Sequence, residues 1–397
     1  MRRPRLVYLV THAVSARLLL AGQLGHLRAA GFDVTVIASP GPDLDVVAAR
    51  EGVDVVPVPM ARAMRPADDA RALVAVTAAL RRLRPDIVNA STPKAGLLGM
   101  LAARALAVPV RIYLLRGLRL ETERGWRRAV LATTERLAAG CADDVIAVSA
   151  SLRRGFVDAG LAPAAKVRVL GAGSSNGVDV ARFAPSPELH AAAAAVRDRL
   201  AIPAGAPVVG FVGRLARDKG IVDLLDAFDR VRATRPDARL LLLSADLADE
   251  DTPAEVARRV PITPGVIAVP RVDDVRPYLA TMDVLGFPSQ REGFPNVVLE
   301  AAALAVPAVG YPVTGVADAI VDGVTGRLVA TGDTGALADA LASYLDDPAR
   351  AVADGEAARA RAVADFARPT VWRRWADLYR DALVARCLPL PVRRDAP

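Results

Sequence analysis

The chain alternates between short apolar runs and longer stretches in which apolar and polar residues recur with a helical period. Runs of this length rich in Val, Ile and Leu predict buried β-strands, and the longer amphipathic stretches predict helices. The apolar runs are 5–10, 33–39, 53–59, 86–90, 109–115, 143–149 and 166–170 in the first half, and 207–213, 238–245, 265–270, 283–289, 307–311 and 326–330 in the second. The helix-length segments include 16–30, 68–84, 119–140, 219–235 and 334–347.

This alternation predicts an α/β protein with parallel sheets that are covered by helices on both faces. Two successive series of strands, each of ordinary domain size, predict two doubly wound, Rossmann-like domains. We expect a first domain over 1–176, a second over 177–365, and a C-terminal aromatic helix and tail over 366–397 that crosses back toward the first domain. Two such domains facing each other would form a ligand-binding cleft at the carboxyl ends of their strands.

The composition narrows the compartment and the cofactors. Hydrophobic residues make up 53% of the 397 residues and charged residues 24%, which is a globular composition. The two cysteines, Cys141 and Cys387, have no metal-type spacing and argue against a disulfide framework. The first apolar run is too short for a secretory signal, and no segment is long enough to span a membrane. We therefore expect a cytoplasmic protein that needs no metal and no cofactor.

The positive charge is concentrated in the first half of the chain. The balance of basic over acidic residues is +11 over 1–176 and −4 over the remainder. A basic half suits a phosphorylated substrate or an anionic membrane surface, and a solvated basic face is an equal alternative. With only three lysines and no basic run interleaved with aromatics, nucleic acid is disfavoured as a partner.

The sequence GRLARDKG, residues 213–220, follows a predicted strand and precedes a predicted helix. Gly213 would form the turn, and Arg214 and Lys219 would bring two cations to the carboxyl end of that strand. A glycine turn, two cations and a helix N-terminus form an anion site. The alternative is an ordinary surface loop with solvated basic residues.

A second loop, in EGFPNVVLE, carries Glu292 before a predicted helix and Glu300 inside it. Pro295 suits the first helical turn, which leaves the N–H groups near Asn296 and Val297 available to a phosphate. Glu300 lies about one turn further, roughly 6 Å along the axis, which is the step from a diphosphate to a ribose. In the purely structural alternative, Glu292 would interact with the dipole of the helix at its first turn, and Glu300 would be a charge on the helix surface. The apolar sequence AAALAVPAVG that follows disfavours this alternative for Glu300, because an unpaired charge is costly in apolar surroundings.

These two motifs together resemble the retaining nucleotide-sugar glycosyltransferases of family 4, which have the GT-B fold. The resemblance covers most of the chain and includes TPKAGLLG (92–99), SSNGVDVARF (174–183), VDDVRPYLATMDVLGFPS (272–289) and DGVTGRLVATGD (322–333). TPKAGLLG and RGLRLETE are similar to the subgroup that assembles surface polysaccharide on lipid carriers. Taken together the motifs are specific, although each alone is weak.

The resemblance implies a role for each residue of the second domain's site. Glu300 would bind the ribose, Arg214 and Lys219 the diphosphate, and Glu292 the hydroxyls of the donor sugar. The nucleotide-sugar set is completed by Gly213, Gly293, the backbone of Phe294, Asn296 and Val297, and Arg271 and Val272 beside the base. Family habit favours uracil as that base and transfer with retention by front-face attack, in which the departing phosphate takes the acceptor's proton.

The first domain departs from the family pattern at two places. The usual Gly-Gly loop after the first strand is replaced by THAVSARLLLAGQL, where Gly22 and Gly25 are expected inside a helix. Arg116 follows a strand at the position where many members carry a histidine, and we expect it to bind the sugar or phosphate. His12 is a second candidate for the cleft, with a satisfied loop histidine as its equal alternative. Ser91, Thr92 and Lys94 end another strand and are the expected acceptor side.

The acceptor remains open between a polyprenyl-diphosphate-linked sugar and a soluble molecule. The segment 119–140, with Trp126 beside three arginines, predicts an amphipathic helix that could touch an anionic membrane at its inner face, or one that simply packs on the core. Other classes fit less well. A 2-epimerase would need carboxylates and histidines as general acids and bases in the cleft, and the chain has only three histidines. A phosphorylase would need a lysine that binds pyridoxal phosphate, and none of the three lysines is an obvious candidate. A non-catalytic binding protein would not require the cationic loop opposite the two glutamates.

Overall fold

A computed structural model describes residues 2–61 and 65–391, so residues 392–397 of the expected C-terminal tail lie outside the described chain. Contacts group the chain into two compact units. One unit comprises the chain up to Asn176 together with the segment from Arg368 onward, and the other comprises Gly177–Ala367. Each unit is described by itself below.

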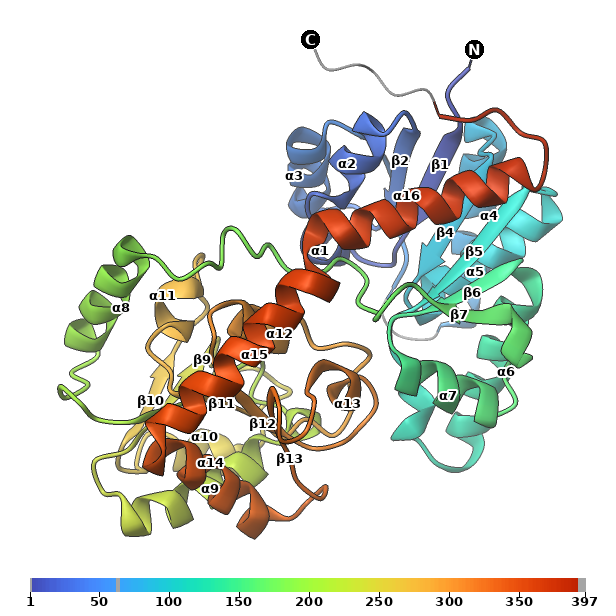
Figure 1. Cartoon of the computed structure of the whole chain (residues 1–397). Helices are drawn as coiled ribbons and strands as arrows, with labels where there is room; N and C mark the ends of the chain where they lie inside the picture. Colours follow the sequence, from blue (N-terminus) through green and yellow to red (C-terminus); the bar gives the residue numbers. More distant parts are fainter. Residues whose placement is uncertain (1, 62–64, 392–397) are drawn as a thin grey trace. The chain divides into compact units, whose positions relative to one another are not determined.

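The first unit is built on a seven-stranded parallel sheet with the order β3-β2-β1-β4-β5-β6-β7 (Figure 1). Its strands are β1 (Arg5–Leu9), β2 (Asp33–Ala38), β3 (Asp54–Pro57), β4 (Ile87–Ser91), β5 (Val110–Leu115), β6 (Asp144–Ala147) and β7 (Val167–Val169). Its helices are α1 (Ala13–Leu19), α2 (Gln23–Ala29), α3 (Pro42–Glu51), α4 (Pro66–Leu83), α5 (Pro93–Ala105), α6 (Gly125–Cys141), α7 (Ala150–Asp158) and α16 (Arg368–Val384), with short 3₁₀ turns at Arg119–Glu121 and Ala164–Lys166.

The second unit is built on a six-stranded parallel sheet with the order β10-β9-β8-β11-β12-β13. Its strands are β8 (Val208–Val212), β9 (Arg239–Leu243), β10 (Val266–Val269), β11 (Val284–Phe287), β12 (Ala308–Gly310) and β13 (Gly326–Leu328). Its helices are α8 (Pro187–Arg199), α9 (Ile221–Thr234), α10 (Ala254–Arg259), α11 (Arg276–Leu279), α12 (Asn296–Ala303), α13 (Val316–Ala319), α14 (Thr334–Asp346) and α15 (Pro348–Phe366), with a 3₁₀ turn at Arg217–Lys219.

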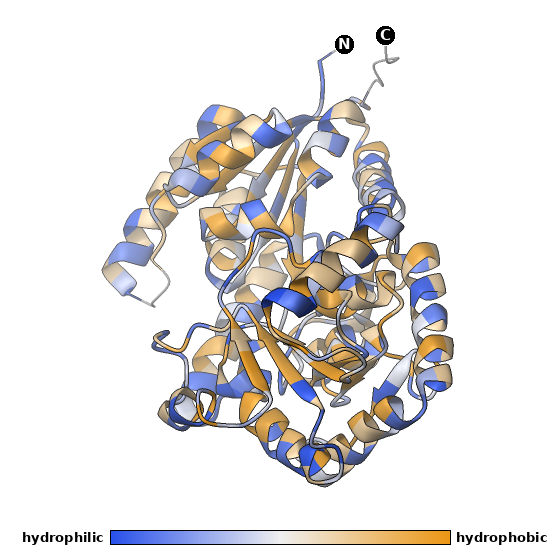
Figure 2. Cartoon of the chain, turned by 90° about the vertical axis from the view of Figure 1, so that its left-hand side faces the viewer, coloured by the Kyte–Doolittle hydropathy of each residue, from blue (hydrophilic) through white to orange (hydrophobic). Residues whose placement is uncertain are grey.

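The thirteen strands of the described chain fall within the thirteen predicted apolar runs or one residue beyond them. Figure 2 shows that the strands are mainly hydrophobic, whereas the helices carry hydrophobic and hydrophilic residues on different sides. This distribution follows from parallel sheets with helices on both faces, because such strands bury both of their faces. The predicted class, two doubly wound α/β domains, is confirmed.

The predicted helix over 16–30 is wrong in one respect, because the structure divides it into α1 and α2 at Gly22. Gly22 has φ +77°, and a Cβ atom there would lie 2.5 Å from Cη2 of Trp372, so only glycine fits this break. The buried carboxylate of Glu51 accepts hydrogen bonds from the N–H groups of Gly22 and Gly25 at 2.8 and 3.0 Å. The start of α2 is therefore already capped by an anion of the chain itself.

The predicted amphipathic helix over 119–140 is also divided. A 3₁₀ turn occupies Arg119–Glu121, and α6 begins only at Gly125. Leu120 is buried, and its carbonyl accepts a hydrogen bond from the Arg128 guanidinium at 2.6 Å, so the chain folds back there instead of continuing as a helix. Residues 124–130 are exposed, among them Trp126 at 72%.

The C-terminal helix α16 packs against α2 in the first unit (Figure 1). The Trp372 indole N–H donates to Oδ1 of Asn176 at 2.6 Å, and that of Trp375 donates to the Ser175 carbonyl at 3.1 Å. The Tyr379 hydroxyl is 2.6 Å from the Tyr8 hydroxyl on β1. These buried polar contacts fix α16 on the unit that contains the first strand of the chain.

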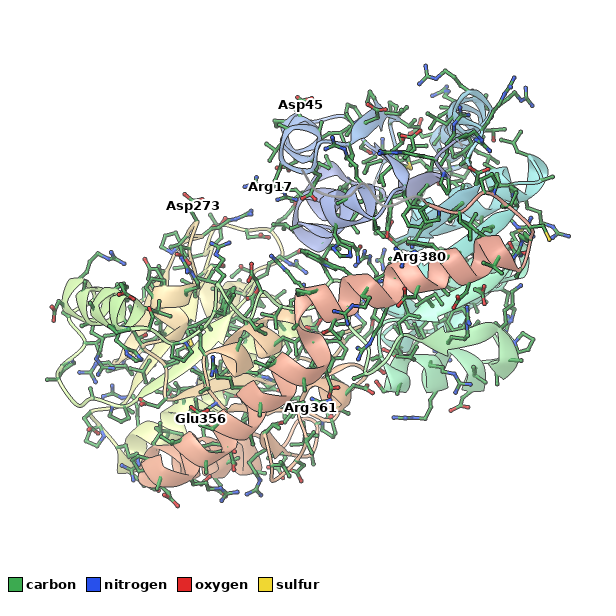
Figure 3. The ribbon with its side chains drawn as sticks, turned by 45° about the horizontal axis from the view of Figure 1, so that its top comes forward. Arg17, Asp45, Asp273, Glu356, Arg361 and Arg380 are labelled. Atoms are coloured by element: carbon green, nitrogen blue, oxygen red, sulfur yellow. The ribbon has the colours of Figure 1, made fainter. Side chains whose placement is uncertain are left out.

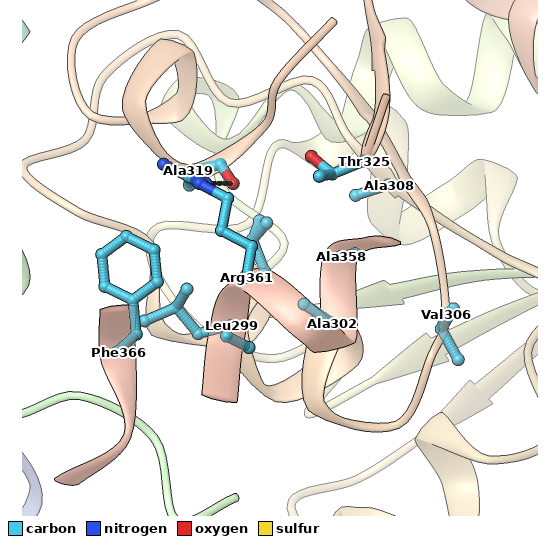
Figure 4. Close-up of a pocket in the computed structure, with 11 residues that line it drawn as sticks. Leu299, Ala302, Val306, Ala308, Ala319, Thr325, Ala358, Arg361 and Phe366 are labelled. Atoms are coloured by element: carbon cyan, nitrogen blue, oxygen red, sulfur yellow. Dashed lines mark hydrogen bonds between the residues drawn. The ribbon is translucent and has the colours of Figure 1, made fainter. Parts of the chain in front are cut away.

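In the second unit, the end of α15 packs against the loop that carries Phe294. The Arg361 guanidinium donates to the carbonyls of Asp318 and Ala319 at 2.7 and 2.8 Å and lies 4.9 Å from the ring centre of Phe366 (Figure 4). Phe366 in turn is 5.1 Å from the ring of Phe294. The contact between these two rings therefore stabilises the position of the Phe294 loop.

Candidate functional site

In each sheet the order of the strands reverses at one place, between β1 and β4 in the first unit and between β8 and β11 in the second. Loops diverge at such a switch point and leave a crevice outside the carboxyl ends of the strands, where open α/β sheets bind ligands. The predicted residues His12, Ser91, Thr92 and Lys94 lie at or just beyond the ends of β1 and β4, and Gly213, Arg214, Lys219, Glu292 and Phe294 follow β8 and β11. The sheet order therefore brings each set to one edge of its own sheet.

Lys219 and Glu292 form an ion pair in the second unit. Lys219 Nζ lies 2.6 Å from Glu292 Oε1, although the two residues are 73 positions apart in the chain. Their side chains are only 24% and 14% exposed, so solvent screens the pair less than it screens a surface pair. The hydroxyl of the fully buried Ser289 lies 2.9 Å from the same carboxylate oxygen and holds it from a second side.

The two loops that carry this pair are tied together through their backbones. The Gln290 N–H donates to the Asp218 carbonyl at 2.9 Å, and the Arg291 guanidinium lies 3.1 Å from the Asp218 carboxylate. Gly220, at φ +70°, passes so close to Pro288 that a Cβ atom would lie 1.9 Å from the Pro288 carbonyl oxygen. Glycine at position 220 therefore allows the two loops to touch.

Helix α12 begins one residue later than predicted, since Pro295 is its N-cap residue and Asn296 its first helical residue. An α-helix leaves its first N–H groups without an intrahelical acceptor, and no acidic residue occupies this first turn. The N–H groups of Asn296 and Val297 thus form a partial positive charge beside Glu292. Glu300 is half-buried on the next turn, with Val298 and Leu299 buried next to it.

The remaining predicted residues of the second unit lie further out. Arg214 is exposed and forms an ion pair with Asp251, a partner that sequence reasoning missed. Arg271 is exposed and Val272 half-buried, both in the loop after β10. Gly213 and Gly293 flank the pair on the two loops and complete the predicted set.

In the first unit, a threonine follows each of β1 and β4, and the two threonines meet. The hydroxyls of Thr11 and Thr92 are 2.7 Å apart, and Thr92 has φ +71°, a strained conformation for a β-branched residue. His12 is the N-cap residue of α1. Lys94, in the first turn of α5, forms an ion pair with Asp69 in the first turn of α4. In the sequence, the pair Asp68 and Asp69 is typical of a helix start or a turn and gives no sign of a distant partner.

Arg116 follows β5 and is bound by two hydroxyls. Its Nε and Nη1 atoms donate to Ser91 and Ser175 at 3.2 and 2.6 Å, whereas Nη2 is buried and has no hydrogen-bond partner in the described chain. No carboxylate of the described residues lies within ion-pairing distance of this guanidinium. Burial lowers the pKa of Arg116 to about 10, so the group is still charged at neutral pH. A buried cation with a free donor is suited to an anionic ligand.

Sequence reasoning missed several partners of these groups, chiefly Ser175, Ser289 and Asp69. Ser175 lies in the stretch predicted as a linker, and Ser289 ends a predicted strand, but a lone serine gives no signal of which distant side chain it will meet. The sequence Asp43-Leu44-Asp45 imitates a metal-binding DxD motif and is expected in a polar loop. The structure places it in the first turn of α3, where Asp43 pairs with Arg17 at 2.8 Å.

Within residues 2–61 and 65–391, no group of three or more His, Cys, Asp or Glu side chains could hold a metal ion. In the same part of the chain, no helix is both long enough and apolar enough to cross a bilayer.

Replacement of Glu135 by Gln is expected to change the pH dependence of stability. Burial on α6 raises the pKa of Glu135 to about 7, while the Tyr113 hydroxyl donates to Oε2 at 2.7 Å. Because the folded protein binds this proton more tightly than the unfolded chain, the wild type should lose stability as the pH rises from about 4.5 to 7, by roughly 3 kcal/mol at most. Glutamine can accept the same hydrogen bond without a charge.

The free energy of unfolding, measured in urea at pH 5 and pH 8, checks this expectation. The difference in stability between the Gln variant and the wild type should be more favourable to the variant at pH 8 than at pH 5. Exposed Glu356 on α15 offers a matched control. The free energy of unfolding of a Glu356→Gln variant should differ from that of the wild type by the same amount at pH 5 and at pH 8. An identical difference at both pH values would mean that Glu135 titrates normally.

Comparison with known proteins gives matches over both units. Residues 19–173 match the family described as "Glycosyl transferase 4-like domain", and residues 206–347 match "Glycosyl transferases group 1". The capsular polysaccharide biosynthesis glycosyltransferase CapM of Staphylococcus aureus is 33% identical over 388 residues, which cover 96% of this chain and 98% of CapM. An alpha-maltose-1-phosphate synthase of Mycobacterium tuberculosis is 32% identical over 361 residues, covering 82% and 88% of the two chains.

Solved structures show the same fold at lower identity. Anabaena Alr3699/HepE in complex with UDP and glucose superposes with a TM-score of 0.80 at 21% identity, covering 96% of this chain and all of the other. Sucrose-phosphate synthase from Thermosynechococcus elongatus superposes with a TM-score of 0.79 at 21% identity, again covering 96% and 100%.

Proposed function

This chain belongs to the family 4, group 1 glycosyltransferases, and from that premise we propose that it transfers a hexose or N-acetylhexosamine from a UDP-linked donor, with retention, to a hydroxyl of a polyprenyl-diphosphate-linked acceptor. The observation that carries the donor part is the group formed by Lys219, Glu292 and the first turn of α12. It presents a cation, a carboxylate and the N–H groups of the first helical turn at the edge of the sheet where β8 and β11 end.

Each part of this group would meet a different part of the donor. Lys219 and the N–H groups of Asn296 and Val297 would stabilise the diphosphate as its negative charge grows during departure, an electrostatic contribution that is commonly the largest in catalysis. The Glu292 carboxylate would accept hydrogen bonds from the sugar hydroxyls, and Glu300, one turn along α12, those of the ribose. The uracil assignment is supported by the solved structure of HepE, which is a complex with UDP and glucose.

The acceptor part of the proposal is supported by the first unit. CapM, by its name, acts in capsular polysaccharide biosynthesis. The exposed start of α6 carries Trp126 with Arg127 stacked 5.7 Å from its ring centre, a combination of aromatic and basic side chains that suits contact with an anionic membrane. A soluble phosphorylated acceptor is the second candidate, since the M. tuberculosis relative is named for a maltose phosphate product.

The test of the donor site is the binding of UDP to wild type and to a Glu300→Ala variant, measured by isothermal titration calorimetry beside GDP, ADP and dTDP. We expect UDP to bind best and the variant to bind it about 1–3 kcal/mol more weakly, the scale of a lost charge-assisted hydrogen bond. Glu356→Ala, on the exposed side of α15 (Figure 3), is the matched control and should bind UDP normally. Equal binding by wild type and the Glu300 variant would refute the ribose assignment.

The stereochemistry has its own readout. Proton NMR of the product from an α-configured UDP-sugar should show an α linkage, and a β linkage would reject retention.

A further inference from the structure

The donor loop, defined here as residues 290–295, carries Glu292 and is supported by a residue that the proposed donor site does not use. This residue is Arg361 on α15, which is half-buried beside Leu299 and Ala302 of α12 (Figure 4). The cavity next to it measures about 10 Å³, which is room for one water molecule at most. Because a larger ligand does not fit there, any role of this charge in the reaction must act through its protein neighbours.

The first of these neighbours is the end of α13. The Arg361 guanidinium donates hydrogen bonds to the carbonyls of Asp318 and Ala319 at 2.7 and 2.8 Å. The helix α13 begins directly after Gly315, and Gly315 passes against the donor loop. A Cβ atom at Gly315 would lie only 2.3 Å from the carbonyl oxygen of Gly293. The position of α13 therefore fixes the space that is left for Gly293.

The second neighbour is Phe366, at the end of α15. Its ring centre lies 4.9 Å from the Arg361 guanidinium, and the residue is fully buried. Phe366 packs in turn on Phe294, with 5.1 Å between the two ring centres. Arg361 therefore acts on two consecutive residues of the donor loop, on Gly293 through α13 and on Phe294 through Phe366. A planar guanidinium can donate two hydrogen bonds from its edge and place its face on a ring, whereas a lysine ammonium has no such plane.

We propose that Arg361 is a positioning residue for glycosyl transfer, which keeps Gly293 and Phe294 in place so that Glu292 meets the donor sugar. The proposal rests on the transferase function and adds to it a residue that touches no substrate. Because the donor loop is neither helix nor strand, its position depends on contacts with neighbouring elements. Transfer tolerates little displacement, since a shift of about 1 Å can cost on the order of a hundredfold in rate.

The alternative is that Arg361 only stabilises the fold by binding the last carbonyls of α13. Arg359, on the same helix, is the matched control, because it is also half-buried and its Nε donates to a backbone carbonyl, that of Ala303, at 3.2 Å. Ala303 is the last residue of α12, at the opposite end of that helix from the donor loop. Loss of either arginine should lower stability to a similar degree, but only loss of Arg361 should disturb the donor loop.

The experiment measures the release of UDP from UDP-glucose and UDP-N-acetylglucosamine with water as the acceptor, so that it does not depend on the natural acceptor. Arg361→Met keeps a long side chain against α12 and should lower kcat about tenfold or more with the donor that the wild type turns over. Arg361→Lys should stay about fivefold or more below the wild type, and Arg359→Met should change kcat less than about twofold. UDP affinity, measured by calorimetry, should stay within about a factor of two in all three variants, because the proposed UDP contacts at Lys219 and Glu300 remain.

Two further measurements separate positioning from stability. In Arg361→Met the amides of the donor loop should exchange hydrogen for deuterium about tenfold faster than in the wild type, whereas Arg359→Met should leave this rate unchanged. If Arg361 acts through Phe294, the double variant with Phe294→Leu should lose less in kcat than the product of the two single losses. Urea unfolding of every variant verifies that it is folded and gives the loss of stability with which these changes are compared.

The outcomes distinguish this proposal from the donor assignment. If Arg359→Met lowers kcat as much as Arg361→Met, if Arg361→Lys restores the wild-type kcat, or if the double variant shows the full product of the single losses, the positioning role is overturned while the donor site stands. Unchanged hydrogen exchange in the donor loop of Arg361→Met overturns it as well. If the wild type itself does not bind UDP, the donor proposal fails, and the exchange rates still decide whether Arg361 fixes the donor loop.

Discussion

A Glu292→Gln variant is expected to lose at least a hundredfold in kcat and yet bind UDP more tightly than the wild type. Glu292 has two roles in the proposed site. It would bind the sugar hydroxyls during transfer. In the protein without ligand, its carboxylate forms an ion pair with Lys219, and Glu292 Oε1 lies 2.6 Å from Lys219 Nζ. UDP lacks the transferred sugar, whose hydroxyls Glu292 would bind, so for UDP the Glu292 carboxylate only competes with the diphosphate for Lys219. Glutamine removes that competition and also removes the charged acceptor that transfer needs.

Two measurements check this pair of opposite effects. Calorimetry with UDP should show a severalfold gain in affinity, and single-turnover kinetics with UDP-sugar should show the loss in rate, about 3 kcal/mol in activation free energy for a hundredfold. The matched control is Glu255→Gln, because Glu255 pairs with Arg217 in the same unit at 2.8 Å but with both side chains largely in solvent. That variant should change neither quantity. Weaker UDP binding by Glu292→Gln would mean that the carboxylate supports the cation instead of competing with the diphosphate.

Replacement of Arg116 by Met is expected to abolish most transfer, at least a hundredfold in kcat/KM, without destabilising the protein. Arg116 is half-buried, its guanidinium has no carboxylate partner in the described chain, and its buried Nη2 atom has no hydrogen-bond partner there and can donate to an anionic ligand. Desolvation of an unpaired cation costs free energy in the folded state, and methionine removes that cost while filling a similar volume. This gain should offset the two lost hydrogen bonds to serines, so the free energy of unfolding should change by less than about 1 kcal/mol or rise.

Arg111, on β5 itself, provides the contrasting case. Its guanidinium is bound by the Asp143 carboxylate at 2.7 Å, so Arg111→Met leaves a partly buried acceptor without that partner and should cost roughly 1–3 kcal/mol of stability. Its effect on kcat/KM should be small. Urea unfolding and steady-state kinetics of both variants test the contrast. Arg116→Met that unfolds readily yet transfers normally would make Arg116 a structural residue and reject its role at the ligand.

The sequence predicted the sheet strands well because each strand is a continuous apolar run, and burial on both faces allows little else. Helix boundaries were harder to predict. The segment 16–30 has an unbroken helical pattern, and only the docking of Trp372 from the far end of the chain explains why Gly22 must be glycine and why the helix stops there. Such a contact joins residues that are remote in sequence, so no local pattern contains it.

The candidate site shows the same division. The cations of GRLARDKG, the start of α12 and Glu300 one turn along it predicted a site for a nucleoside diphosphate, because residue type and distance along one helix carry that information. The donor sugar came from the resemblance to the family 4 glycosyltransferases. The sequence could not show that Lys219 forms an ion pair with Glu292, or that Lys94 forms one with Asp69. The local pattern indicates a helix start or a turn at Asp69, and the structure has it in the first turn of α4.

By itself, then, the sequence determined the fold class, the strand positions and the kind of ligand that the second unit suits, since these depend on hydrophobic period and on short-range spacing. The tertiary structure alone decided which charges are paired and that Arg116 meets two serine hydroxyls and, among the described residues, no carboxylate. The physical reason is the order of the strands. β8 lies beside β11 and β1 beside β4, so side chains far apart in the chain come within hydrogen-bonding distance only after the sheets have formed.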